Sequence, residues 1–190
     1  TKAQHYHEQA LAIKRKSPDI LKTIPTLSSI FSIYSKMQKD ALAEKYYQEA
    51  WQIAVEKNSK PWQQSLMASY GDHLKRKGRN KEALTYYEQS LSMAEPQGNK
   101  IAIQELRETL ADLEASLGHY GKAYAYRQAY DETQKEMFQE DLDRKVVDLE
   151  QRYELQQRLG EAERDLQDAV TISSTRKKQL VWMLVAVLLT

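Results

Sequence analysis

The sequence predicts an all-α protein, and three observations support this class. Only 6 Gly and 4 Pro occur among 190 residues, which disfavours a turn-rich β-sandwich. Ala, Leu, Lys, Glu and Gln, which favour helices, are abundant. Apolar residues recur at intervals of three, four and seven, the spacing of amphipathic helices. Because 41% of the residues are hydrophobic, the chain has enough apolar material to bury a core.

Charge and cysteine content exclude several classes of function. Lys and Arg number 28 against 27 Asp and Glu, so the formal net charge of +1 gives no general attraction to nucleic acid. The absence of Cys removes disulfides, thiolate zinc sites and cysteine nucleophiles.

The chain contains an internal repeat of 40 residues. A small residue recurs at Ala3, Ala43, Ala83 and Ala123. A tyrosine recurs at the same spacing, at Tyr6, Tyr46, Tyr86 and Tyr126. Within each copy these residues share one stripe of an amphipathic helix, and the similarity decays only in the fourth copy. The small residue would let a neighbouring helix approach closely.

A second helix precedes each of these stripes. From Trp62 apolar residues recur at three and four, and Gly78 is placed to end that helix before the next one begins. Pro61 and the segment 95–99 separate the units. The array over 1–138 therefore consists of a half repeat and three whole repeats, which occupy 1–17 and about 24–60, 64–98 and 104–138.

Six residues of the third unit carry a family resemblance: Gly71, Gly78, Ala83, Tyr87, Ser90 and Pro96. Their order resembles the tetratricopeptide repeat, with Ser90 in place of the usual Ala and Leu74 in place of the usual Tyr. The match is weaker in the fourth unit, where Arg127 stands at the aromatic position. The resemblance implies a solenoid of helix-turn-helix units whose first helices line a concave groove that binds a protein or peptide.

The resemblance also implies which side chains face that groove. The candidate ligand or peptide residues are Ser28, Ser32, Ser35, Lys36, Asp72, Lys75, Arg76, Glu108, Asp112 and Ser116, which are expected to be exposed. A clamp for a C-terminal carboxylate is disfavoured, because Asp72 stands where an Asn is expected. Glu105, Glu108 and Asp112 form an acidic stripe that could hold a cation or a basic peptide, although a solvated face is the commoner meaning of such a stripe.

No catalytic, cofactor or metal site is expected. His5 and His7 are two residues apart and point to different faces of a helix, and His73 and His119 have no neighbouring His or Cys in the sequence. Phosphate-binding loops, a nucleophile elbow and the H-E-x-x-H motif are all absent from the sequence. The segment is therefore expected not to be an enzyme.

The pattern changes in residues 139–178, a charged helical connector. Leu142, Val146, Leu149 and Tyr153 form one apolar seam, and Leu155, Leu159, Ala162, Leu166 and Ala169 form a second seam that is out of phase by one residue. Two interpretations are open: a parallel coiled coil in a homodimer, or a single helix that packs back on the last repeat.

An uncharged apolar run follows Arg176, Lys177 and Lys178 and occupies most of residues 179–190. This pattern is typical of the first half of a transmembrane helix, since its length of about 16 Å is half of a hydrocarbon core of roughly 30 Å. The alternative is a C-terminal helix that packs into the core of the protein.

The order of repeats, connector and membrane segment resembles membrane-bound bacterial sensors, and the run 148–154 is similar to the connector of tetratricopeptide sensor histidine kinases. The resemblance implies the signal-input region of a two-component or related protein in the inner membrane, with extracytoplasmic repeats. The basic cluster before the apolar run favours the opposite orientation. The alternative function is a membrane-anchored scaffold without signalling output.

Overall fold

The computed structural model describes Gln9, Leu11 and residues 19–188 of the chain, with side chains as far as Met183. The half repeat expected in 1–17 therefore lies almost entirely outside the described residues. The chain divides into two compact units, Thr1–Met137 and Phe138–Thr190, and each is described by itself.

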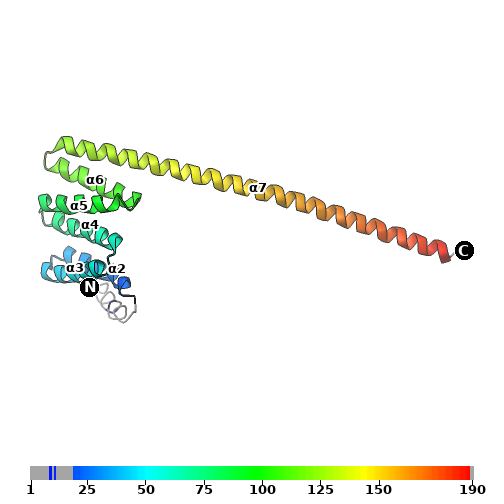
Figure 1. Ribbon diagram of the computed structural model, residues 1–190, viewed down its shortest axis with the longest axis horizontal. Helices are drawn as coiled ribbons and strands as arrows, with labels where there is room; N and C mark the ends of the chain where they lie inside the picture. The colour runs from blue at the N-terminus through cyan, green and yellow to red at the C-terminus, as the bar shows by residue number, and fades with distance from the viewer. Residues whose placement is uncertain (1–8, 10, 12–18, 189–190) are drawn as a thin grey trace. The chain divides into compact units, whose positions relative to one another are not determined.

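The described residues are helical and contain no strand, which confirms the all-α prediction. A short 3-10 helix, η1 (Ile20–Thr23), precedes six α-helices. They are α2 (Ile24–Lys36), α3 (Asp40–Glu56), α4 (Lys60–Arg76), α5 (Asn80–Ala94), α6 (Lys100–Ser116) and α7 (Tyr120–Leu188). In the first unit α2 packs against α3 and α4 against α5, and α6 lies beside the first turns of α7 (Figure 1).

The turns of the first unit recur every 20 residues. At each turn one residue has a positive φ: Gln38, Asn58, Gly78, Gly98 and Gly118. The backbone N–H of the next residue bonds to a carbonyl five residues earlier, as from Lys39 to Tyr34 at 2.9 Å and from Ser59 to Ala54 at 2.8 Å. These left-handed caps end each helix and reverse the chain. Each repeat of 40 residues is thus a pair of antiparallel helices divided by equivalent turns.

Two hydrophobic clusters form the core of the stacked helices. One is built around Phe31, Tyr47 and Leu66, and the other around Tyr87 and Leu110. The recurrent small residues Ala43, Ala83 and Ala123 are all buried. The tyrosines three residues further on, Tyr46, Tyr86 and Tyr126, are all half-buried and pack on these clusters, whereas Tyr6 lies outside the described residues.

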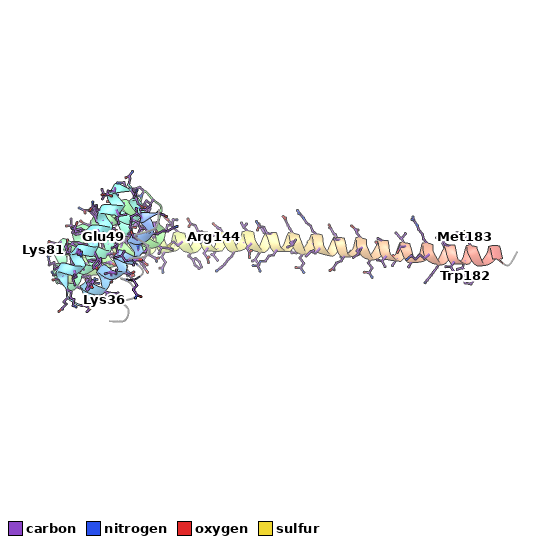
Figure 2. All side chains as sticks on the ribbon, turned by 90° about the horizontal axis from the view of Figure 1, so that it is seen from below. Lys36, Glu49, Lys81, Arg144, Trp182 and Met183 are labelled. Carbon is purple, nitrogen blue, oxygen red and sulfur yellow. The ribbon has the colours of Figure 1, made fainter. Side chains whose placement is uncertain are left out.

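The second unit is formed by the remainder of α7, which runs without a break through Gly160. Its described apolar side chains are exposed, from 39% at Leu142 to 74% at Trp182. Trp182 and Met183 project from the last turns of α7 whose side chains are described (Figure 2). The alternative of a C-terminal helix that packs into the core stays a prediction.

The apolar run at the end of α7 was expected to begin a membrane span, and the structure describes part of it. Within the described part of the chain, no helix combines the length and the apolar character needed to cross a bilayer. Residues 189 and 190 of the apolar run, and the side chains from 184 onward, lie outside the description. The truncated transmembrane helix expected in 179–190 stays a prediction.

Candidate functional site: a groove between α4 and α6

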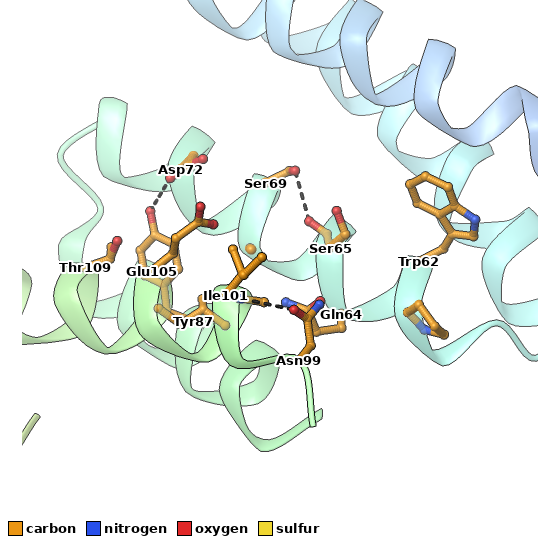
Figure 3. A pocket seen from close by; sticks show the side chains of 14 residues that line it. Trp62, Gln64, Ser65, Ser69, Asp72, Tyr87, Asn99, Ile101, Glu105 and Thr109 are labelled. Carbon is orange, nitrogen blue, oxygen red and sulfur yellow. Dashed lines mark hydrogen bonds between the residues drawn. The ribbon is translucent and has the colours of Figure 1, made fainter. Parts of the chain in front are cut away.

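A cavity of about 540 Å³ opens between the first helices of two consecutive repeats. Its walls are α4 and α6, and Tyr87 of α5 lies between them (Figure 3). The lining consists of Pro61, Trp62, Gln64, Ser65, Ala68, Ser69, Asp72, Tyr87, Asn99, Ile101, Ala102, Glu105, Leu106 and Thr109. First helices thus form this groove, as the tetratricopeptide resemblance implies.

The floor of the groove depends on a close approach between Tyr87 and Gly71. The Tyr87 ring is 2% exposed, and a Cβ added at Gly71 would lie only 2.8 Å from Tyr87 Cε1. Glycine therefore lets the ring lie against α4. The Tyr87 hydroxyl donates to Asp72 Oδ1 at 2.6 Å, and burial, together with this carboxylate, raises the pKa of Tyr87. The phenol thus stays protonated and holds the Asp72 side chain in place.

A buried polar pair fixes α4 on α5 beneath the groove. Gln64 Nε2 donates to Ser90 Oγ at 2.9 Å, and the Ser90 hydroxyl donates to the Gln64 carbonyl oxygen at 2.9 Å. Both side chains are buried, so these bonds satisfy groups that would otherwise destabilise the core. This pairing explains why Ser90 replaces the Ala that is usual in the tetratricopeptide pattern.

The lining is apolar at one end and acidic at the other. Trp62 lies toward one end and Asp72 toward the opposite end (Figure 3). Ile101, on α6, is 62% exposed. Asp72 and Glu105 are the charged side chains of the lining, and both are negative.

The predicted groove residues are only partly brought together. Asp72 lines the cavity, whereas the other nine candidates do not. Ser28 and Ser32 are half-buried on α2, one repeat before Ala68 and Asp72. The remaining exposed candidates lie on the same helices but outside the cavity: Lys36, Lys75, Arg76, Glu108, Asp112 and Ser116.

The expectation that Ser35 is exposed is wrong, because its side chain is buried against α4. Arg76 Nη2 donates to Ser35 Oγ at 2.8 Å, and His73 Nδ1 lies 2.7 Å from the same hydroxyl, within hydrogen-bond distance. His73 Nε2 is 4.0 Å from Asp40 Oδ1. The residue types match a catalytic triad, but Ser35 and His73 are buried, at 5% and 3% exposed. The cluster joins α2, α3 and α4.

Sequence reasoning missed most of the lining. Trp62, Ser65 and Ser69 precede Asp72 at helical spacing, and Glu105 and Thr109 stand one repeat after Ser65 and Ser69. A search for positions related to Asp72 by three, four or seven residues, repeated at an offset of 40, would have found these serines and their counterparts on α6. Asp112 is the counterpart of Asp72 one repeat later and continues the stripe of Glu105 and Thr109 beyond the cavity, whereas Glu108 lies on a neighbouring stripe of α6.

A second buried titratable side chain lies at the end of α6. Glu114 is fully buried, at the position that Leu74 occupies one repeat earlier, and its Oε2 is 2.6 Å from His119 Nδ1. Its Oε1 makes no hydrogen bond but lies 3.6 Å from Lys122 Nζ. Among the described residues no group of three or more His, Cys, Asp or Glu side chains is placed to hold a metal ion.

Comparison with known proteins identifies the fold. No protein-family model matches the sequence, and no curated protein matches it. Among solved structures, BtubC (BKLC) from P. vanneervenii is similar to this chain with 21% sequence identity and a TM-score of 0.60, over 70% of this chain and 54% of BtubC. The tetratricopeptide domain of Arabidopsis FLU is similar with 19% identity and a TM-score of 0.52, over 59% of this chain and 94% of that domain.

These likenesses concern the fold alone, because both identities are low. This chain spans about half the length of BtubC. Together with the helix pairs and the groove formed by first helices, the comparisons show that the chain has a tetratricopeptide-like fold.

Proposed function

We propose that this chain is a non-catalytic protein-interaction region, and that the groove between α4 and α6 binds a segment of a partner polypeptide. The observation that carries the proposal is the cavity itself, which has apolar, hydroxyl and acidic side chains along one concave face. Binding sites for polypeptides combine an apolar anchor with a few positioned polar groups in this way.

A groove-filling variant tests the proposal. Peptides selected by the full chain from a displayed random library should lose binding to Ser69→Trp, because Ser69 lines the cavity and an indole would fill it. Ser92→Trp is the matched control, since Ser92 lies outside the cavity and both hydroxyls donate to carbonyls of their own helices. Selected peptides that bind Ser69→Trp as well as the unmodified chain would exclude this groove as their site.

The finer proposal is that this groove is the input surface of a membrane-anchored bacterial signalling protein, such as a sensor histidine kinase. Its support is the sequence order of repeats, charged connector 139–178 and apolar run 179–190. In this proposal binding changes the connector, which passes the change to an output domain. A kinase, cyclase or DNA-binding domain encoded downstream would support it, and a stop codon shortly after the apolar run would favour the membrane-anchored scaffold.

For this signalling protein we propose a location in the inner membrane, with the repeats outside the cytoplasm. An alkaline phosphatase fused to the repeats is active only outside the cytoplasm, so strong activity supports this orientation. Inactive fusions that are stably produced would place the repeats in the cytoplasm, as the basic cluster 176–178 favours.

We further propose that the connector pairs with the connector of a second copy of the chain. The described apolar side chains of this unit are exposed, as at Leu149 and Leu159, which are 65% and 57% exposed. Seams of this kind are covered by a partner helix in coiled coils.

A further inference from the structure

The charged side chains that line the groove between α4 and α6 are both negative. Asp72 and Glu105 line it, and no Lys, Arg or His does. Two nearby cations are engaged elsewhere: Arg76 donates to Ser35 Oγ at 2.8 Å, and Arg107 Nη2 lies 3.0 Å from Glu95 Oε1. The charged groups that a ligand meets in the lining are therefore both acidic.

Both carboxylates have acceptor capacity left for a ligand. Asp72 accepts one hydrogen bond from the Tyr87 hydroxyl, on Oδ1, and is otherwise exposed. Glu105 is exposed and makes no hydrogen bond or ion pair within the described part of the chain. Because Tyr87 is buried and fixed by Gly71, the Asp72 carboxylate is held in position before any ligand arrives.

The uncharged side chains of the lining also restrict which ligands fit the groove. Trp62 and Ile101 supply apolar surface, and the hydroxyls of Ser65 and Thr109 lie in the wall. Along α4 the ten residue steps from Trp62 to Asp72 cover about 15 Å, the reach of about four to five residues of extended peptide. The groove therefore has room for an apolar side chain and a basic side chain of the same short segment.

We propose that the occupant is a polypeptide segment that places a Lys or Arg side chain against Asp72 and Glu105 and an apolar side chain against Trp62 and Ile101. This inference rests on the proposed function and adds the chemistry of the partner. An acidic segment, or a chain end that presents its carboxylate here, would be repelled by the same two side chains.

The test uses peptides selected by the full chain from a displayed library of random twelve-residue peptides. Selected sequences should be enriched in Lys or Arg with an apolar residue within about five positions, and their binding should weaken as salt is raised. The double variant Asp72→Asn and Glu105→Gln should weaken binding of a selected fluorescent peptide by about tenfold or more. Asp72→Asn keeps an oxygen that accepts from Tyr87, so the floor of the groove is retained.

The double variant Asp131→Asn and Glu132→Gln is the matched control, because it removes two exposed acidic charges of α7 that lie outside the cavity. It should leave the affinity within about twofold. Circular dichroism establishes that each variant is folded.

The outcomes separate the two proposals. Suppose that Ser69→Trp blocks the selected peptides. If these peptides are not enriched in basic residues, or bind the double variant Asp72→Asn and Glu105→Gln as well as the unmodified chain, the basic-segment inference is overturned and the interaction proposal stands. Peptides that ignore Ser69→Trp, or a library that yields no binder, would overturn both.

Discussion

The hydroxyl of Tyr87 lies 2.6 Å from Asp72 Oδ1 and donates a hydrogen bond from a ring that is 2% exposed. This bond connects the floor of the groove, on α5, with its acidic wall on α4. Through this bond the buried Tyr87 fixes the position of the exposed Asp72 carboxylate, which a partner could contact.

Removal of the Tyr87 hydroxyl tests how much its hydrogen bond to Asp72 contributes to stability. Tyr87→Phe is expected to lower the free energy of unfolding by about 1 kcal/mol, the usual net contribution of one such bond. Tyr86→Phe is the control, because the neighbouring Tyr86 is half-buried but its hydroxyl makes no hydrogen bond in the described part of the chain. Urea unfolding of the two variants measures the difference, and equal losses would show that the bond to Asp72 contributes nothing.

We expect the stability of the fold to require glycine at position 71, because the Tyr87 ring lies against it. Ala would gain up to about 1 kcal/mol in helix propensity, but its Cβ would meet Tyr87 Cε1 at 2.8 Å. We expect Gly71→Ala to lower the free energy of unfolding by about 1–3 kcal/mol, the cost of overpacking a core. In a Tyr87→Leu background the same change should be neutral or stabilising. A loss of equal size in both backgrounds would show that the two positions are not coupled.

The fold was largely predictable from the sequence, because its determinants are local and repeated. Ala43, Ala83 and Ala123 recur at a spacing of 40, and the turn glycines at 78 and 118 are visible in the sequence. The turns at Gln38 and Asn58 were not marked by glycine, although both residues have positive φ. They could be found only by extending the 20-residue spacing from the glycines.

The site was less predictable, because lining a cavity depends on how far each helix is rotated about its axis. Periodicity placed both Glu105 and Glu108 on the solvent side of α6, and only the packing of α6 against α5 decides which of them faces α4. Ser35 was misplaced for a related reason. Its position next to exposed Lys36 gave no sign that His73 and Arg76, about 40 residues away in sequence, would bury its hydroxyl.

The left-handed turn at Gln38 predicts a stabilising substitution. Gln38 has φ 57°, a conformation that costs a residue with a Cβ about 1 kcal/mol or more and glycine little. Gln38→Gly should therefore raise the free energy of unfolding by about 0.5 kcal/mol after the added chain entropy of glycine is subtracted. Gly118→Ala, at the equivalent turn with φ 81°, should lower it by about 1 kcal/mol. Urea midpoints that move in the opposite directions would contradict this account of the turns.

The buried His73 predicts that stability falls in mild acid. Burial lowers the pKa of His73 below 6.5, and the cations of Lys77 and Arg76 add to this effect, while Asp40 and Glu44 oppose it. Below pH 6.5 the unfolded chain therefore binds more protons than the folded chain. The contribution of His73 to stability is complete above about pH 6.5 and is lost as the pH falls through the folded pKa.

Thermal unfolding measured from pH 8 to pH 5 should show this loss. The pKa of Asp40 is lowered by its hydrogen bond with Lys77, so that carboxylate stays ionised in this range. His73→Gln should have a flatter profile than the unmodified chain. If both profiles fall equally, another group is responsible for the acid sensitivity.

The absence of cysteine makes the proposed pairing of connectors directly testable. Val146 belongs to the seam of Leu142, Leu149 and Tyr153, whereas Val147 belongs to neither seam, and the two valines are almost equally exposed, at 53% and 51%. In a parallel, in-register coiled coil each seam residue meets its own copy. Val146→Cys should therefore form a covalent dimer on mild oxidation, and Val147→Cys should stay largely uncrosslinked.

Light scattering should give a dimer mass for the unmodified chain. A single helix leaves the apolar side chains of the seams in water, and pairing with a second helix buries them. A monomer mass at all concentrations up to about 100 μM, far above the dissociation constants usual for stable coiled coils, would show that the seams are not covered by a second copy.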